Sequence, residues 1–239
     1  GIADVLGFDA SPNTIDELLS TNMILAIGFN ASDNPVIQLK MKQAAEAGAK
    51  VVLVNPEDYV QHIDFLNKAV YTKNDLSFLK EVAKAVVDSG RGAGVDGYEA
   101  FAASVKDVTV SDDAKAVADM YLEAKKAMIV FNQNLITTEA ASLLADIALI
   151  SVHIGTPRDG ILQVKAKNNS QGLVDLGITA GAEELEGEKA LVVFGEEADI
   201  DTDALEFLAV SDTHMTALAA KADVVIPGTG FASTDGTYT

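Results

Sequence analysis

Short apolar runs of strand length alternate with amphipathic stretches of helix length along most of the chain. Thr21–Gly28 predicts a strand buried on both faces of a sheet, because the run is largely apolar and ends at a glycine. Pro35 then marks a helix start, and Gly48 ends that helix before the next strand, Val51–Val54. Residues 21–56 therefore predict one right-handed βαβ unit.

The same rhythm continues toward the C-terminus. Further strands are expected at 69–71, 127–131, 190–195, 207–211 and 223–227, and further helices at 75–88, 111–126, 138–150 and 213–221. Ser89–Gly97 is rich in glycine but follows a helix, so its context favours a turn over a phosphate loop. Ser151–Gly177 is rich in Gly, Asn and Gln, which predicts an irregular loop region that is either functional or only a connector.

These elements predict the fold class: α/β, with two Rossmann-like lobes built on parallel sheets. The first lobe is expected to span residues 1–182 and to contain the loop region 151–177. The second, residues 183–239, is expected to be part of a smaller, truncated lobe that begins at an acidic connector, Glu183–Lys189.

Charge narrows the possible functions. The chain has 239 residues, with 36 Asp and Glu against 17 Lys and Arg, a formal charge of −19. Nucleic-acid backbones and anionic membrane surfaces both require clustered cations, so neither is an expected partner. Apolar runs fall short of the ~18 residues that span a bilayer, and the N-terminus lacks a secretory pattern. We therefore expect a folded cytoplasmic protein without direct membrane insertion.

The chain has no cysteine, which excludes disulfides, thiolate nucleophiles and cysteine ligation of iron–sulfur clusters within it. Its three histidines, His62, His153 and His214, are far apart in sequence and do not favour a zinc site. His153 adjoins the loop region but shows no orienting partner in the sequence, so a catalytic role is not favoured. We predict no catalytic and no metal-binding residue.

Candidate binding residues follow the predicted strands. Ligands of open parallel sheets gather beyond the carboxyl ends of the strands, where helix N-termini also point. This geometry nominates positions that could contact a nucleotide, although a glycine after a strand is also a common turn device. They are Gly28, Phe29 and Asn30, then Asn55, Pro56 and Glu57, then Gly195, Glu196 and Glu197, and finally Ser211, Asp212 and Thr213.

Seven segments, taken in order, resemble the large subunit of the molybdopterin-guanine-dinucleotide oxidoreductases. That family includes formate dehydrogenase and the large iron–sulfur subunit of complex I. The segments are Met23–Asn30 with Asn34-Pro35-Val36, Gly48–Pro56, Ile154–Ile161, Asn168–Gly177, Phe194–Asp199, Val210–Thr216 and Ala222–Tyr238.

The resemblance implies that the pterin dinucleotide of the family binds at matching positions here. These are Gly28, Asn30, Asn55, Pro56, Asp75, Asn169, Gln171, Gly172, Gly195, Glu196 and Asp212. Two motifs depart from the family. Its Asp-Pro-Arg becomes Asn55-Pro56-Glu57, which loses the cation, and its Gly-Thr-Asp becomes Lys73-Asn74-Asp75. A carboxylate at position 57 is unfavourable beside a pyrophosphate.

Two functions therefore remain open. The favoured one is a piece of the large subunit of an NAD(P)H-linked redox complex, of the NADH dehydrogenase or hydrogenase type, in which the dinucleotide-binding domain has become a structural scaffold without a cofactor. The alternative is the cofactor-binding domain of a molybdenum- or tungsten-dependent formate dehydrogenase, which would hold molybdopterin guanine dinucleotide. A weaker likeness of Ala124–Leu144 to thiamine-dependent enzymes lacks their Gly-Asp-Gly motif.

The resemblance also implies partners. It identifies the chain as an internal piece of a longer subunit, with the iron–sulfur domain and its clusters upstream of Gly1. That domain and the sister subunits of the complex are the expected partners. They require a docking face that is less acidic and more apolar than the chain as a whole.

Overall fold

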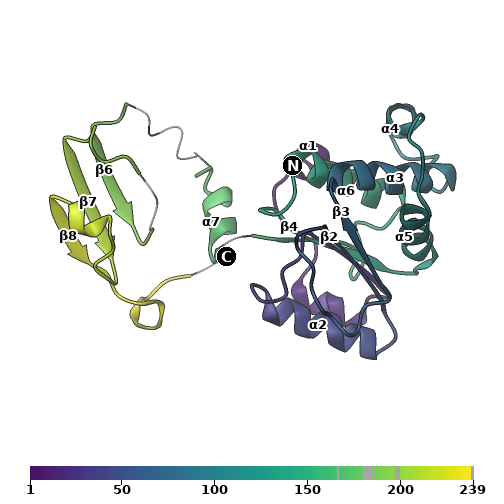
Figure 1. Ribbon diagram of the computed structural model, residues 1–239, viewed down its shortest axis with the longest axis horizontal. Helices are drawn as coiled ribbons and strands as arrows, with labels where there is room; N and C mark the ends of the chain where they lie inside the picture. The colour runs from purple at the N-terminus through teal and green to yellow at the C-terminus, as the bar shows by residue number, and fades with distance from the viewer. Residues whose placement is uncertain (166, 180–184, 186, 197–199, 238–239) are drawn as a thin grey trace. The chain divides into compact units, whose positions relative to one another are not determined.

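The computed structural model describes residues 1–165, 167–179, 185, 187–196 and 200–237. The chain divides into two compact units, Gly1–Lys167 and Asn168–Thr239 (Figure 1). The predicted lobe boundary between residues 182 and 183 lies outside the described residues and stays a prediction.

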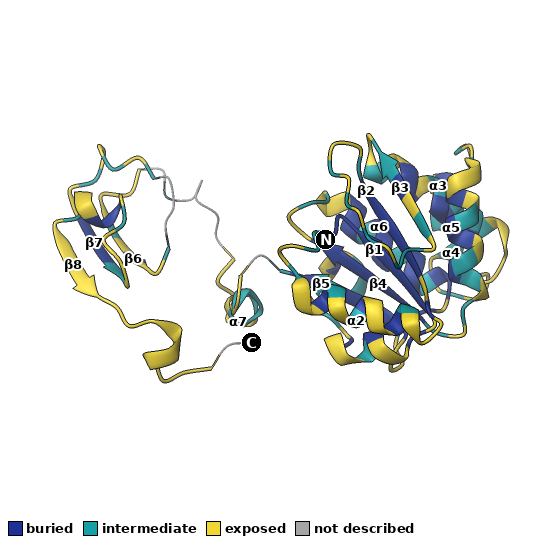
Figure 2. Ribbon diagram, turned by 60° about the horizontal axis from the view of Figure 1, so that its bottom comes forward, coloured by how far each residue is buried: buried dark blue, intermediate teal, exposed yellow. Residues whose placement is uncertain are grey.

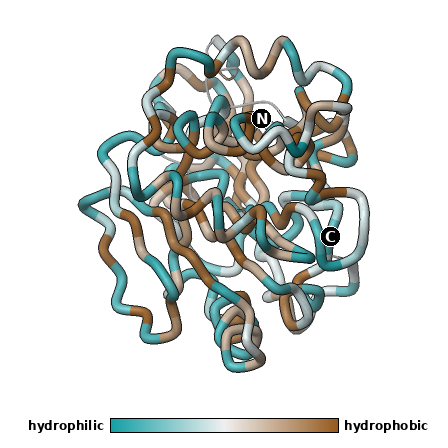
Figure 3. The backbone as a smooth tube through the Cα atoms, turned by 90° about the vertical axis from the view of Figure 1, so that its right-hand side faces the viewer, coloured by the Kyte–Doolittle hydropathy of each residue, from teal (hydrophilic) through white to brown (hydrophobic). Residues whose placement is uncertain are grey.

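The first unit contains a five-stranded sheet in which all neighbouring strands are parallel. Its strand order is β3-β2-β1-β4-β5. The predicted parallel α/β architecture is therefore confirmed. Along the chain, stretches of hydrophobic residues alternate with stretches of hydrophilic residues (Figure 3). The strands are β1 (Met23–Ile27), β2 (Lys50–Pro56), β3 (Lys68–Thr72), β4 (Ala127–Asn132) and β5 (Gly160–Val164).

Helices cover both faces of this sheet (Figure 2). Leu25 and Val52 face one helical layer, whereas their neighbours Ile24 and Val51 face the other. Because both faces are buried, all five residues of β1 are apolar and buried. The first layer contains α1 (Ala3–Leu6), α3 (Asp75–Asp88), α4 (Tyr98–Val105), α5 (Asp112–Glu123) and α6 (Thr138–Ile150), and the second contains α2 (Pro35–Glu46) and a 3-10 helix, Ile15–Ser20.

Two local expectations for the first part of the chain need correction. Residues 151–177 are not irregular throughout, because they contain β5 and the short helix α7 (Ser170–Asp175). At five residues, β5 is too short to stand out among polar neighbours, and pairing with β4 makes it a strand. Helix α4 follows the glycine-rich turn, and the sequence pattern did not predict it.

The second unit holds a smaller sheet of three parallel strands, in the order β6-β7-β8. Its buried core is small and consists of Val193, Leu208, Val210, Leu218 and Ala219. The strands are β6 (Ala190–Phe194), β7 (Phe207–Asp212) and β8 (Val224–Pro227), and short 3-10 helices span Ala219–Lys221 and Phe231–Ser233.

The helix predicted over residues 213–221 is reduced to the 3-10 turn Ala219–Lys221. Thr216 explains the late start, because its hydroxyl accepts a hydrogen bond from the backbone N–H of Ala219 at 3.1 Å. A threonine side chain that caps a turn in this way competes with helix formation across its own position. Among the described residues, no helix is long and apolar enough to cross a membrane.

Candidate functional site

The carboxyl ends of the five parallel strands meet at one edge of the first sheet, and four predicted residues follow or end these strands. Gly28 follows β1, and Asn55 and Pro56 end β2. Asp75 begins α3, shortly after β3. This is the edge at which ligands of doubly wound sheets bind.

A hollow of about 320 Å³ opens at this edge. Asn74 caps α3, because its side chain accepts a hydrogen bond from the Ser77 N–H at 2.8 Å. Thr137 caps α6 in the same way, because its hydroxyl accepts a hydrogen bond from the Ala140 N–H at 3.2 Å. The caps therefore use part of the hydrogen-bonding capacity with which these helix ends attract anions. The lining residues are Pro56, Thr72, Lys73, Asp75, Asn134, Leu135, Ile136 and Thr137.

Carboxylates offset the positive charge around the hollow. Among the described residues that line it, Lys73 is the single cation, and its Nζ lies 4.0 Å from Oε2 of Glu57. Tyr59 follows the end of β2. Partial burial and the nearby Asp33 carboxylate raise the pKa of its phenol. An anion that entered this edge would therefore meet Asp75 and Glu57 together with Lys73.

Asn55 connects two strand ends and faces the protein interior. Its Oδ1 accepts a hydrogen bond from the backbone N–H of Phe29 at 2.9 Å, and its Nδ2 donates to the Phe29 carbonyl at 3.1 Å. The residue is 1% exposed, so these bonds satisfy buried groups. The amide that the resemblance assigns to a ligand thus fastens the loop after β1 to the end of β2.

Asn30 is likewise engaged within its own loop. Its Nδ2 donates to Oδ2 of Asp33 at 2.6 Å, and its Oδ1 accepts from the Ser32 N–H at 2.9 Å. Gln61 holds the same loop from outside, because its Oε1 accepts from the Ala31 N–H at 2.8 Å and its Nε2 donates to the Phe29 carbonyl. No sequence signal identified Gln61, since it lies in a segment without periodicity.

Gly28 has a structural reason to be glycine. Its φ is +58°, and an added Cβ would lie 2.9 Å from Cγ2 of Ile136 and 3.1 Å from Cβ of Leu135. The loop after β4 therefore packs directly on this position. Close approach of another part of the chain accounts for this glycine without a phosphate.

In the second unit, Gly195, Glu196 and Asp212 lie at the carboxyl edge of the smaller sheet. The Gly195 N–H donates to the Ser211 carbonyl at 2.8 Å. Oδ1 of Asp212 accepts hydrogen bonds from the backbone N–H groups of Thr213 at 2.6 Å and His214 at 3.3 Å. This carboxylate caps its own turn, and its predicted contact with a guanine edge stays a prediction.

The remaining predicted residues lie together at the start of α7. Asn169 precedes the helix with a φ of +62°, and Gln171 and Gly172 lie in its first turn. Nε2 of Gln171 donates to Oδ1 of Asp175 at 2.7 Å. Their convergence with Gly28 and Asn30 on one crevice stays a prediction.

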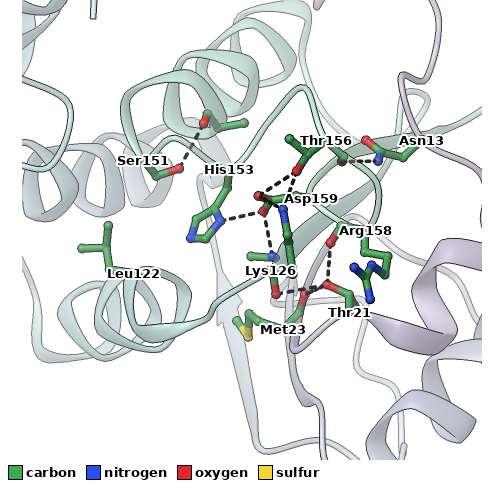
Figure 4. A network of polar contacts seen from close by, with 12 residues as sticks. Asn13, Thr21, Met23, Leu122, Lys126, Ser151, His153, Thr156, Arg158 and Asp159 are labelled. Carbon is green, nitrogen blue, oxygen red and sulfur yellow. Dashed lines mark hydrogen bonds and ion pairs between the residues drawn. The ribbon is translucent and has the colours of Figure 1, made fainter. Parts of the chain in front are cut away.

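A second polar network lies at the opposite, amino-terminal edge of the first sheet (Figure 4). Nδ1 of His153 lies 2.7 Å from Oδ1 of Asp159, which also accepts from the Ala127 N–H at 3.0 Å. Lys126 Nζ is 3.3 Å from Oδ2 of the same carboxylate. The expectation that His153 lacks an orienting partner was therefore wrong, because the loop returns Asp159 to it six residues later.

Burial decides what this pair can do. His153 is 0% exposed and packs edge-on against Tyr121, with ring centroids 4.9 Å apart. Desolvation lowers the pKa of His153 despite the opposing effect of Asp159. The imidazole has no exposed surface that a substrate could reach. We therefore assign His153 and Asp159 a structural role, in which they hold the loop before β5 in place. Ile154–Ile161, one of the segments that carry the family resemblance, thus lies away from Gly28 and Asn55.

The chain matches known proteins over most or all of its length. Residues 9–239 match the family described as Molybdopterin oxidoreductase. Formate dehydrogenase H of Escherichia coli is 23% identical, and the match covers 100% of this chain and 43% of that protein. The NADPH-Fe(3+) oxidoreductase subunit alpha of Geobacter sulfurreducens is 24% identical over 74% of this chain and 24% of its own length. The chain thus spans less than half of these relatives.

A solved structure shares the fold. It is a chain of the formyltransferase/hydrolase complex from Methylorubrum extorquens, determined with methylofuran. The TM-score is 0.64 at 14% identity, and the match covers 95% of this chain and 67% of that one.

Proposed function

Because this chain belongs to the molybdopterin oxidoreductase family, we propose that it is a structural scaffold within the large subunit of an NAD(P)H-linked redox complex. In this proposal the domain keeps the dinucleotide-binding architecture without holding the dinucleotide. Its partners are the iron–sulfur domain of the same subunit and sister subunits of the complex. The cytoplasmic location expected from the sequence belongs to this proposal.

One observation carries the proposal. At the carboxyl edge of the first sheet, Lys73 is paired with Glu57, which stands where the family has a basic side chain. A pyrophosphate needs cations and free N–H groups, whereas the described residues of this edge set the single cation Lys73 against the carboxylates of Asp75 and Glu57. Asn30 and Asn55 already bond to their own chain. The described residues of this edge therefore do not fit an anionic dinucleotide, and we derive no chemistry through it.

Similarity to the relatives supports both functions. The NADPH-Fe(3+) oxidoreductase subunit alpha favours the scaffold of an NADPH-linked complex. The formate dehydrogenase H match, which covers all of this chain, favours the alternative of a cofactor-binding domain in a formate dehydrogenase. That alternative requires cations from outside this edge to neutralise the pyrophosphate.

Two measurements separate these functions. After acid oxidation, the purified chain should release no pterin fluorescence, whereas a stoichiometric signal would establish the cofactor-binding alternative. Calorimetric titration with guanosine diphosphate, which is half of the dinucleotide, should show no saturable binding to the wild type. Micromolar binding would contradict the scaffold.

A pair of variants tests whether charge at position 57 is the cause. Glu57→Arg removes the partner of Lys73 and restores a cation, so it should create measurable binding of guanosine diphosphate. Asp58→Arg makes the same change of charge at the next position and leaves the ion pair between Lys73 and Glu57 in place. Equal binding by both variants would mean that binding of guanosine diphosphate depends on the net charge of the protein and not on this site.

A further inference from the structure

The loop between α6 and β5 begins with an unfavourable backbone conformation. The φ of Val152 is +60°, in the left-handed region that β-branched residues rarely adopt. Its side chain is 53% exposed, so burial of the valine itself does little to offset this conformation. Such a backbone persists only where the surrounding structure imposes it. We therefore ask what holds residues 152–155, which we call the strained segment.

His153 is the buried anchor of the strained segment (Figure 4). Its side chain is 0% exposed, whereas its neighbours in the segment are exposed or partly exposed. The ring packs against Tyr121, and its Nδ1 lies 2.7 Å from Oδ1 of Asp159. The His153 backbone N–H donates to the Ala148 carbonyl at 2.9 Å. The segment is thus held to the first unit through one titratable side chain.

The surroundings of His153 suit the neutral ring. An ionised carboxylate only accepts hydrogen bonds, so Nδ1 carries the proton and donates to Asp159. Nε2 is buried as well, and no described residue forms a hydrogen bond with it. Protonation would place a second N–H at Nε2, where the described residues offer it no acceptor. A charged ring would therefore give up hydrogen bonds that it makes in water.

The charges near His153 also oppose a protonated ring. Oδ2 of Asp159 lies 3.3 Å from Nζ of Lys126, so this carboxylate is already shared with a cation. Arg91, in the turn after α3, is a second cation nearby, while Tyr121 of α5 and Ser151 at the end of α6 are uncharged. Burial lowers the pKa of His153 below 6.5, and Arg91 acts in the same direction, against the opposing effect of Asp159.

The second half of the loop is held by other parts of the chain. Nδ2 of Asn13 donates to the Thr156 carbonyl at 3.3 Å, and the Thr21 hydroxyl donates to the Arg158 carbonyl at 2.9 Å. Neither bond involves His153. Residues 156–159 therefore stay in place when the strained segment moves.

We propose that the strained segment is an acid-sensitive latch, in which protonated His153 leaves its buried site and residues 152–155 open while residues 156–159 stay on the sheet. Asp159 then keeps the Ala127 N–H and Lys126, so its buried carboxylate remains compensated. Opening also releases the unfavourable backbone of Val152. The latch does not depend on whether the first unit binds a dinucleotide.

The direction of the pH dependence follows from the sign of the shift. The pKa of His153 in the closed segment is below the 6.5 of an exposed histidine. The closed form is therefore fully favoured above pH 6.5 and loses stability as the pH falls below that value. In this range the ratio of open to closed segment should rise by about tenfold for each pH unit, until the pKa of the closed form is reached.

Amide hydrogen exchange in the full chain, from about pH 7 to about pH 5, tests the latch above the usual titration range of carboxyl groups. After correction for the intrinsic pH dependence of exchange, protection of the Val152 and His153 N–H groups should fall by about tenfold per pH unit below 6.5. The Ile161 N–H, which donates to Oδ1 of Asn13 at 3.2 Å, is the reference and should keep its protection. Constant protection of the strained segment, or an equal loss at Ile161, would overturn the proposal.

A pair of histidine variants identifies the titrating group. His153→Asn keeps an N–H donor toward Asp159 but cannot take up a proton in this range, so the pH dependence of opening should vanish. His62→Asn, at an exposed position outside the network, should retain the wild-type dependence. A pH dependence that persists in His153→Asn would contradict the assignment.

Nuclear magnetic resonance of the wild-type imidazoles gives an independent test that requires no variant to fold. At neutral pH His153 should carry its proton on Nδ1, and it should titrate below 6.5. A proton on Nε2, or titration above 6.5, would overturn the latch, because the buried site would then favour the charged ring.

Discussion

Both sheets of this chain are parallel, but they differ in strand order and in what surrounds them. The five-stranded sheet is buried between two helical layers, and its strand ends are connected by internal hydrogen bonds such as those of Asn55. The three-stranded sheet has a core on one side only. Equivalent positions after β1 and β6 therefore experience different environments. Identical substitutions in the two sheets should have different costs, and this difference can be measured.

Gly28 and Gly195 should show the largest contrast. Both have a φ of +58°, but an added Cβ meets Ile136 and Leu135 at Gly28 and nothing within 4 Å at Gly195. Gly195→Ala should cost about 1–2 kcal/mol, from the left-handed backbone alone. Gly28→Ala should cost about 1–3 kcal/mol more, from overpacking. Urea unfolding followed by circular dichroism measures the free energy of unfolding of both variants. Equal decreases would mean that the loop after β4 moves to accommodate the added methyl group at little cost.

Two strand valines test burial in the same way. Val52 is 0% exposed in β2, whereas Val192 is 53% exposed in β6. Val52→Ala should reduce the free energy of unfolding by about 2–3 kcal/mol, because it removes buried methyl groups from the core and leaves a cavity in their place. Val192→Ala should change it by no more than about 0.5 kcal/mol. A large loss at Val192 would show that this side chain is covered within the free chain.

The polar strand ends provide the next contrast. Asn55→Ala leaves the buried N–H of Phe29 without a partner and should cost about 1–3 kcal/mol. Asp212→Ala removes the cap of an exposed turn, whose N–H groups water can then satisfy, and should cost about 0.5–1 kcal/mol. Denaturation midpoints compare the two. A reversed order would contradict the structural role assigned to Asn55.

The smallest expected effect concerns acid stability. Hydrogen bonds from the Arg158 backbone and Asn13 lower the pKa of Glu17 from 4.5 to about 2. Because the folded pKa lies below the unfolded value, this stabilisation is complete above pH 4.5 and is lost as the pH falls toward 2. Glu17→Gln should flatten the decline in that range, whereas Glu206→Gln, in an exposed ion pair of the second unit, should not. Equal slopes for Glu17→Gln and the wild type would refute this.

Several elements were predictable because each carries its own local signal. The strands at β1, β2 and β4 are uniformly apolar, and α3 has a regular apolar stripe behind an Asn74 cap. The order of strand and helix then implied a parallel sheet. Candidate positions at the strand ends followed from that topology. The short strand β5, by contrast, becomes a strand through its pairing with β4.

The α/β class, the parallel strands and the likeness to the molybdopterin oxidoreductases can all be read from the sequence, since these depend on periodicity and on the order of short motifs. The roles of the polar side chains, by contrast, emerge only once the chain is folded. Asn55 bonds to Phe29, and His153 to Asp159, because the chain returns distant residues to one point. The exposure of apolar residues in β6 and β8 could not be predicted from the sequence either. An apolar strand residue gives the same sequence pattern whether a helix or solvent lies next to it.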